Sequence, residues 1–224
     1  YGLLAGPVTA ATDLFRVVVH AGRTGHSARP HETRDTIWVA NQIVQACYQF
    51  VGRLTDARNP AVFTVCRIHG GEAYNVIPAE VEFGGTLRTT DPADRETLQQ
   101  LLVRVARETG LLYDVEAAVE LTLGAPAVVN DAGLIGHLEA TVRALYGHDA
   151  AFHIPRPSMG GEDFAHYLAH VPGALLRVGT AAGPETRFPL HHARFDLDER
   201  ALAPAALLMA RTLADHLNGA VPLH

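Results

Sequence analysis

Hydrophobic and polar residues alternate with a period of two in the first half of the chain, and this pattern predicts β-strands. Asp13–Ala21 alternates in this way, and Ala61–Ile68 is also rich in β-branched residues, which strands favour. Glu80–Thr89 and Tyr113–Leu123 are expected to be strands as well. The pattern therefore predicts a four-stranded region within residues 13–123.

Two helices are expected between these strands. In Arg34–Arg53 the apolar residues recur at the three- and four-residue spacing of one helix face. Asp91 and Pro92 form a helix start, because Asp caps free backbone N–H groups and Pro suits the first turn. This second helix is expected to stop at Gly110. The order strand, helix, strand, strand, helix, strand is that of a ferredoxin-like antiparallel sheet with two helices on one face.

The second half of the chain has a different pattern. Ala132–Tyr146 and Arg200–Leu217 are predicted to be amphipathic helices, Glu162–Leu168 a short helix, and Ala174–Gly179 a buried strand. A single strand with three helices does not make a stable sheet by itself. We therefore expect this half to be part of an α/β layer whose other strands lie outside it, which makes the fold class α/β with an α+β first half.

Composition narrows the class of protein. The 224 residues are 48% hydrophobic and 19% charged, as in ordinary soluble domains. The formal net charge of -6 disfavours a nucleic-acid partner, and no apolar run reaches the ~20 residues of a membrane span. Cys47 and Cys66 lack zinc or redox spacing, so we expect buried, reduced thiols in a cytoplasmic protein. The 13 histidines are the one compositional feature that points to chemistry.

Three polar clusters are spread along the chain. Gly25–His31 places two histidines and an arginine in a loop, Met159–Phe164 contains Gly-Gly-Glu-Asp, and Pro189–His192 ends in two histidines. Histidine on such a loop is a common zinc ligand, and carboxylates bind metals or orient ligating histidines. We expect the three clusters to assemble one site.

Taken singly, each residue also has a plain structural explanation. His191 and His192 fit a solvated surface loop, and Glu162 fits the acidic first turn of a helix. Asn75 fits a turn cap. Arg88 fits either a solvated strand end or a bidentate contact with a substrate carboxylate.

The order of the motifs is more specific than any one of them. It resembles that of the aminoacylase and carboxypeptidase-like family of two-metal zinc hydrolases, best of all the N-acyl-amino-acid and hippurate amidohydrolases. The resemblance covers essentially the whole chain. The motifs that carry it are Gly25–His31, Asn75–Pro78, Gly85–Thr89, Val128–Asp131, Gly161–Phe164 and Pro189–His192.

The resemblance implies a division into two domains. Residues 13–123 would be a ferredoxin-like lid and dimerisation domain. Residues 1–12 would lead in from a zinc-exopeptidase-like α/β catalytic domain, and residues 124–224 would be its C-terminal part. By analogy, the chain would form a homodimer through the lid, with the strand Glu80–Thr89 and the helix Arg34–Arg53 at the interface.

The resemblance also implies roles for single residues. His26 would stabilise the tetrahedral oxyanion, commonly from across the dimer, and Glu162 would be a supporting catalytic residue. The substrate would be held by Asn75 and Arg88, and also by Gly160. The metal ligand would be His191, with the neighbouring His192 as the open alternative.

The implied reaction is metal-assisted hydrolysis of the amide bond of an N-acyl amino acid or small peptide-like substrate. The divalent metal would be zinc, manganese or cobalt. The family's other metal ligands and its general base lie N-terminal to the lid, and none precedes Tyr1. We therefore expect this chain by itself to bind no complete metal set and to be inactive. The alternative is a non-catalytic dimerisation or ligand-binding module of the same descent.

Overall fold

The computed structural model describes residues 1–219, and the chain divides into two compact units. The sheet unit comprises Thr9–Ala127 and Ser158–Ala165. The helix unit comprises Tyr1–Val8, Val128–Pro157 and the chain from His166 onward. Each unit is described by itself below.

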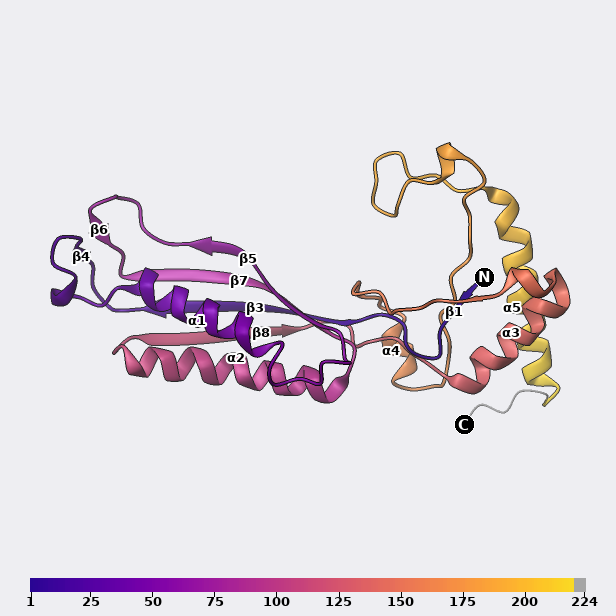
Figure 1. Cartoon of the computed structure of the whole chain (residues 1–224), viewed down its shortest axis with the longest axis horizontal. Helices are drawn as coiled ribbons and strands as arrows, with labels where there is room; N and C mark the ends of the chain where they lie inside the picture. The colour runs from indigo at the N-terminus through magenta and orange to yellow at the C-terminus, as the bar shows by residue number, and fades with distance from the viewer. Residues whose placement is uncertain (220–224) are drawn as a thin grey trace. The chain divides into compact units, whose positions relative to one another are not determined.

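The sheet unit is built on four antiparallel strands in the order β5-β7-β3-β8. Their bounds are β3 (Ala11–His20), β5 (Ala61–His69), β7 (Glu80–Thr89) and β8 (Glu116–Leu123). Together with the helices α1 (Thr36–Phe50) and α2 (Pro92–Leu112), they confirm the predicted ferredoxin-like order (Figure 1).

Alternation along the strands decides which face is covered. In β3 the odd-numbered residues are buried, whereas Leu14, Arg16 and His20 are exposed. The buried residues pack against α1 and α2 in one continuous core. Its fully or almost fully buried members include Phe15, Val17, Val19, Val39, Ile43, Phe83, Leu87, Leu98 and Leu102. The two helices therefore cover one face of the sheet and leave the other open.

Caps set the starts of both helices. The Asp35 carboxylate accepts a hydrogen bond from the Trp38 N–H, so α1 begins two residues after the predicted start at Arg34. The Asp91 carboxylate accepts from the N–H groups of Ala93 and Asp94, which confirms the predicted start of α2.

The predicted stop of α2 at Gly110 is wrong. The helix continues to Leu112, and a Cβ at Gly110 would lie 2.8 Å from the Val115 carbonyl oxygen. This glycine permits close packing against the chain that enters β8. The strand itself begins at Glu116, because Asp114 (φ 54°) turns the chain after the helix.

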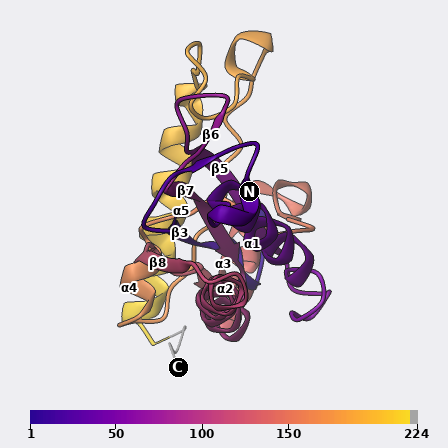
Figure 2. The ribbon, with the colours of Figure 1, turned by 90° about the vertical axis from the view of Figure 1, so that its left-hand side faces the viewer.

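The long strands give the sheet unit two ends. At one end, which we call the tip, β4 (Gly25–His26) pairs with β6 (Val76–Ile77) beyond the His20–Glu80 pair (Figure 1). At the other end, which we call the base, Thr12 pairs with Arg88. In Figure 2 the tip of the sheet unit, with the labelled β6, faces the viewer.

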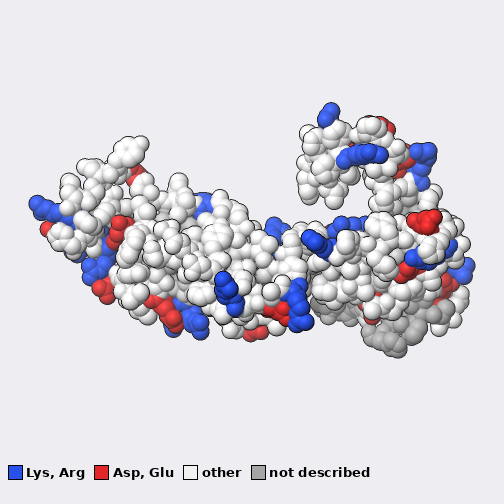
Figure 3. All heavy atoms as spheres, in the orientation of Figure 1, with Lys and Arg blue, Asp and Glu red and all other residues white. Residues whose placement is uncertain are grey.

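The open face of the sheet carries a row of ion pairs across all four strands. Arg16 of β3 contacts Glu82 of β7 at 2.6 Å and Glu120 of β8 at 3.1 Å. Arg67 of β5 contacts the other oxygen of Glu82 at 3.2 Å. Hydrogen bonding from Arg16 holds the pKa of the Glu82 carboxyl below its usual range. In the view of Figure 3, basic and acidic side chains are interspersed over both units.

The helix unit consists of α3 (Ala132–Tyr146) and α5 (Leu202–Leu217), with short strand pairs beside them. β1 (Gly2–Leu3) pairs in parallel with β10 (Phe152–His153), and β2 (Gly6–Pro7) pairs antiparallel with β9 (Val129–Asn130). The core of this unit is small, and its buried members are Leu3, Ile135, Leu138, Val142, Ala151 and Leu208. Only Leu208 of α5 is buried, although the helix is strongly apolar.

Asn130 joins three segments of the helix unit. Its amide nitrogen donates to the carbonyl oxygens of Leu4 and Leu175 at 2.8 Å each, and its side-chain oxygen accepts from the Leu175 N–H at 2.7 Å. The side chain is 3% exposed. In the Val128–Asp131 motif, this asparagine is therefore a structural residue.

Two predictions for the second half need correction. Ala174–Gly179 is not a strand: only an isolated bridge links Arg177 to Gly2, since no described strand lies beside the rest of the segment. The predicted helix Glu162–Leu168 shortens to α4 (Ala165–Leu168). The helix predicted over Arg200–Leu217 is present, with its first residues in a 3-10 turn over Glu199–Ala201.

The two cysteines differ in exposure. Cys47 is buried in α1, and burial raises the pKa of its thiol to about 12. Cys66 is exposed, contrary to prediction, because the register shift between Val65 and Arg67 displaces it from the regular alternation of β5. Within residues 1–219, no helix is long and apolar enough to cross a membrane.

Candidate functional site

The tip of the sheet unit holds His26 and Asn75 close together. His26 pairs with Val76 in the β4–β6 ladder, and the Ser27 N–H donates to the Asn75 carbonyl oxygen at 3.0 Å. Both side chains are exposed. The Ala28 N–H donates to the His26 Nδ1 at 3.1 Å, so the neutral ring carries its proton on Nε2. His26 therefore offers an N–H donor at the tip.

The base of the sheet unit holds Arg88. Its Nη1 donates to the Met159 carbonyl oxygen at 2.8 Å and to the Thr12 Oγ1 at 3.4 Å. The side chain is half-buried in this position. Arg88 therefore lies beside the Gly-Gly-Glu-Asp segment.

That segment has a defined local structure. The Gly160 N–H donates to the Ser158 Oγ at 3.1 Å, and the Gly160 carbonyl oxygen accepts from the Ala10 N–H at 3.1 Å. Glu162 is half-buried, and its Oε1 accepts from the Phe164 N–H at 3.4 Å. The Glu162 carboxylate thus helps to end the loop where α4 begins.

One chain does not bring the tip and the base together. Glu80 at the tip and Arg88 at the base lie eight positions apart in β7, a span of about 26 Å at the rise of an extended strand. His26 and Asn75 therefore lie too far from Arg88 and Glu162 to contact one small substrate with them. Within the sheet unit of one chain, the Gly25–His31 and Met159–Phe164 clusters therefore lie at opposite ends. That all three clusters assemble one site stays a prediction.

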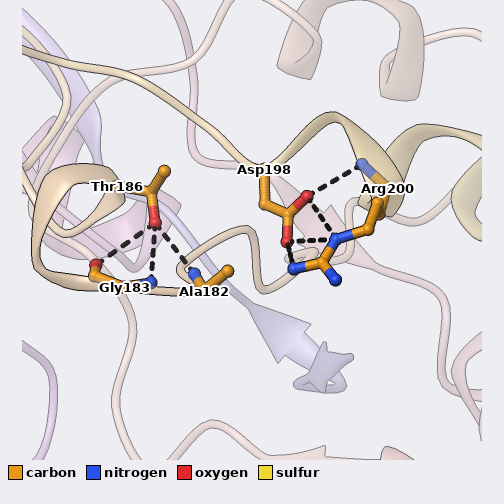
Figure 4. A network of polar contacts seen from close by, with 5 residues as sticks. All are labelled: Ala182, Gly183, Thr186, Asp198 and Arg200. Atoms are coloured by element: carbon orange, nitrogen blue, oxygen red, sulfur yellow. Dashed lines mark hydrogen bonds and ion pairs between the residues drawn. The ribbon is translucent and has the colours of Figure 1, made fainter.

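The third cluster lies on a closed loop of the helix unit. The Asp198 N–H donates to the Thr180 carbonyl oxygen at 2.9 Å and so joins the two ends of the loop. Figure 4 shows the two contacts that brace it: the Thr186 hydroxyl bonds the backbone of Ala182 and Gly183, and Asp198 accepts from Arg200. His191 is carried on this braced loop.

The structure distinguishes His191 from His192. The His192 Nδ1 accepts from the Arg194 N–H at 3.1 Å, and its ring stacks on Phe188 with 4.7 Å between centroids. The ring of His191 is exposed and forms no hydrogen bond within the described residues. His191 also has φ 68°, a left-handed conformation that costs about 1 kcal/mol for a non-glycine residue. Such strain is often found at functional positions.

The described residues do not build a metal centre by themselves. Among residues 1–219, no three His, Cys, Asp or Glu side chains are grouped so that they could hold an ion. His191 is an accessible imidazole, but one ligand does not make a site.

Comparison with known proteins shows which family this chain is similar to. Residues 15–114 match the peptidase dimerisation domain of the M20 type. A Bacillus subtilis N-acetyl-L-cysteine deacetylase is 34% identical over 93% of this chain and 48% of its own length. The chain is similar to the C-terminal part of M20-type metallohydrolases. It spans about half the length of the curated relatives it matches.

Other M20 relatives agree. A Saccharolobus solfataricus thermostable carboxypeptidase is 30% identical over 92% of this chain and 51% of its own length. The crystal structure of a dinuclear metal-binding M20 peptidase from Bacillus subtilis superposes with a TM-score of 0.74 at 27% identity. That match covers 94% of this chain and 51% of the solved one. The recognised family and the fold class are therefore confirmed.

Two neighbours of Arg88 escaped the sequence analysis. The Met159 carbonyl oxygen is a backbone group and leaves no mark in the sequence. Thr12 is a polar residue in a strand. Only the strand register that pairs it with Arg88 distinguishes it from the other polar strand residues.

Proposed function

We propose that this chain forms the lid and the C-terminal part of the catalytic domain in a metal-dependent amidohydrolase that cleaves N-acyl amino acids. Residues 13–123, which lie within the sheet unit, are the lid in this proposal, and residues 1–12 and 124–224 belong to the catalytic domain. The deacetylase and carboxypeptidase relatives support hydrolysis of an amide bond next to a carboxylate. The observation that carries the proposal is the position of Arg88, whose guanidinium faces the Gly-Gly-Glu-Asp loop.

Arg88 binds the carboxylate of the substrate in this proposal. A guanidinium keeps its charge at all working pH values and binds a carboxylate with two parallel hydrogen bonds. The carbonyl oxygen of Met159 holds one end of the group at 2.8 Å, which reduces the entropy lost on binding. Gly160 lies next to this contact and lets the substrate approach the backbone.

His26 stabilises the oxyanion that forms when the amide carbonyl is attacked. The Nε2–H donor left by the Ala28 contact is suited to this task, which is commonly worth about 3 kcal/mol of barrier. Asn75 lies beside it with an exposed amide that can bind the substrate carbonyl.

Two copies of the chain are needed to complete the site. β7 lies between β5 and β3 and has no free edge, so a dimer joined by strand pairing uses an edge strand instead of Glu80–Thr89. β5 is an edge strand that runs from the base at Ala61 to the tip at His69. An antiparallel pair of β5 strands about a two-fold axis places the tip of one copy beside the base of the other. His26 and Asn75 then serve the partner's Arg88.

The apolar surface near this edge favours a homodimer. In α1, Ile37 and Tyr48 are each about half exposed, and in β5 Ile68 is 58% exposed. Burial of such side chains is a main source of dimer stability.

His191 supplies one metal ligand in this proposal. The M20 relative of known structure is a dinuclear metal-binding peptidase, which supports a divalent metal for the intact enzyme. The other ligands and the general base come from residues outside the described chain. Zinc is the first choice, because a neutral imidazole suits it and its lack of redox chemistry fits hydrolysis. The unpaired cysteines fit a reducing, cytoplasmic setting.

Subunit complementation in the enzyme that contains this chain tests the proposal. Each of the variants His26→Ala and Arg88→Ala should hydrolyse N-acetyl amino acids at least about a hundredfold more slowly than the unmodified enzyme. Mixed dimers of the two should regain up to half of the activity per site, since one of their two sites is intact. The same variants without recovery on mixing would show that tip and base act within one chain.

A non-catalytic module remains the second candidate, and one observation favours it. Within residues 1–219 no three metal-binding side chains converge. A module of this kind would dimerise and bind N-acyl amino acids without hydrolysis. Turnover by the enzyme that contains this chain would exclude it.

A further inference from the structure

Thr12 is the residue at which Arg88 and the loop of residues 158–165 meet. It lies on the open face of β3, directly opposite Arg88 in the β3–β7 ladder. Its Oγ1 accepts from the Arg88 Nη1 at 3.4 Å. A Cβ built on Gly161 would lie 2.8 Å from the same oxygen, so the loop backbone packs directly on the Thr12 side chain.

The contacts of Arg88 use one particular end of its guanidinium. Nη1 carries two hydrogens, and the Met159 carbonyl oxygen and the Thr12 hydroxyl account for both. Nε and Nη2 have no hydrogen-bond partner within the described residues. Those two nitrogens form the side of the group that binds a carboxylate with two parallel hydrogen bonds.

The loop is fastened to the base at two further points. The Ala10 N–H donates to the Gly160 carbonyl oxygen at 3.1 Å, and Ala10 is fully buried. The Thr12 N–H donates to the Ala125 carbonyl oxygen at 3.1 Å, which fixes the backbone of Thr12 itself. The backbone of Thr12 is thus fixed within the sheet unit. Its hydroxyl contacts the Arg88 guanidinium, and its side chain packs against the backbone of Gly161.

We propose that Thr12 is a positioning residue, which holds the Arg88 guanidinium so that its Nε–Nη2 side faces a carboxylate ligand and which keeps the Gly160–Gly161 loop against the base. The part that concerns the ligand rests on the proposed function. The part that concerns the arginine and the loop rests on the contacts alone.

Hydrogen exchange of the backbone amides in residues 159–164 tests the loop contact on the 224-residue chain. Thr12→Val keeps the shape of the side chain and removes the acceptor that holds the Arg88 Nη1, the same nitrogen that binds the Met159 carbonyl oxygen of the loop, so exchange should become about five- to tenfold faster. Thr12→Ser restores the hydroxyl and should return exchange to within about twofold of the unmodified chain. Unchanged exchange in Thr12→Val would overturn the proposal. So would exchange in Thr12→Ser that is as fast as in Thr12→Val.

Gly161→Ala provides an independent test of the packing. Its added methyl would press on the Thr12 hydroxyl at 2.8 Å and should accelerate exchange in the same segment about tenfold. The double variant with Thr12→Ala makes room for that methyl, so the second substitution should then add less than about twofold. Additive effects of the two changes would contradict direct packing.

A ligand titration separates this proposal from the proposed function. The Arg88 Nε–H signal is followed by NMR while N-acetyl-L-alanine, or the corresponding amide without a carboxylate, is added. The acid alone should shift the signal, and Thr12→Val should weaken its binding about fivefold while Thr12→Ser does not. If the acid causes no shift but the exchange results hold, the carboxylate role of Arg88 fails and the positioning role of Thr12 stands. If the acid binds Thr12→Val as tightly as the unmodified chain, the positioning role fails.

Discussion

Asp13 and Arg95 form a buried ion pair that joins three segments at the base of the sheet unit. The Asp13 side chain is 1% exposed and accepts from the Arg95 Nε at 2.8 Å. It also accepts from the Gln99 side chain at 2.7 Å and from the Gly124 N–H at 3.1 Å. The Arg95 Nη2 donates in turn to the Gly124 carbonyl oxygen. The strand that enters the sheet, the helix α2 and the segment that leaves β8 are therefore held by one carboxylate.

Replacement of this carboxylate should destabilise the sheet unit strongly. Asp13→Ala leaves the Arg95 charge without its partner in a largely buried place, which costs about 3–5 kcal/mol. Urea denaturation followed by circular dichroism measures the change. The control is Asp56→Ala, which removes an exposed pair with Arg58 and should cost less than about 1 kcal/mol. Equal losses in the two variants would show that Asp13 has no special role.

The same carboxylate should make stability depend on pH in the acid range. Burial raises the pKa of the Asp13 carboxyl, but hydrogen bonds from Arg95 and Gln99 outweigh it and hold this pKa below its usual range. A carboxyl with a lowered folded-state pKa stabilises fully above its unfolded value of about 3.9 and stops doing so below its folded value. The difference in unfolding free energy between the unmodified chain and Asp13→Asn should therefore be constant from pH 7 to 5. It should shrink as the pH falls below about 4. A difference that stays constant down to pH 2 would contradict this.

Gly85 should tolerate no side chain. A Cβ at this position would lie 1.8 Å from the Thr64 carbonyl oxygen, at the point where the register of β5 and β7 shifts. Gly85→Ala must therefore separate the two strands, and we expect a loss of about 2–3 kcal/mol with faster amide exchange along β5. Gly52→Ala is the matched control, because no atom lies within 4 Å of its added methyl. An unchanged unfolding free energy in Gly85→Ala would show that β5 and β7 are farther apart than in this structure.

The left-handed backbone conformation of His191 should reduce the stability of the chain, and its imidazole should be needed for metal binding. Its φ of 68° favours glycine, so His191→Gly is expected to stabilise the chain by about 0.5–1 kcal/mol against thermal or urea unfolding. His191→Ala keeps a Cβ in the strained conformation and should change stability little. In the enzyme that contains this chain, both variants should lose bound metal. Full metal content in either of them would exclude His191 as a ligand.

The isolated 224-residue chain should bind little metal and hydrolyse no N-acyl amino acid at a measurable rate. One accessible imidazole at His191 does not supply the three or four ligands of a zinc site. Metal analysis of the purified chain after zinc loading, with an N-acetyl amino acid assay on the same sample, checks both statements. Stoichiometric zinc with turnover would mean that this chain builds a different site from its own residues.

Local patterns in the sequence were sufficient for the elements of the sheet unit. Alternation marks which residues of β3 and β7 are buried, and Asp91 with Pro92 marks the start of α2. These signals depend on neighbours within a few residues, so they do not change with the packing of the rest of the chain. The order of the elements then restricts the topology to few solutions. The motif order similarly sufficed to recognise the family.

Only the tertiary structure decided how the candidate residues are grouped. It places Arg88 against the Met159 carbonyl, 71 positions away, and it separates Arg88 from His26 by the length of β7. It also leaves Ala174–Gly179 without a neighbouring strand, so an apolar run that reads as a strand forms a single bridge. Periodicity reports which face of a segment is apolar, whereas the identity of the segment packed against it depends on contacts between residues distant in the sequence. For that reason the sequence alone determined the order of elements in the sheet unit and the resemblance to the family, and the fold determined which residues meet.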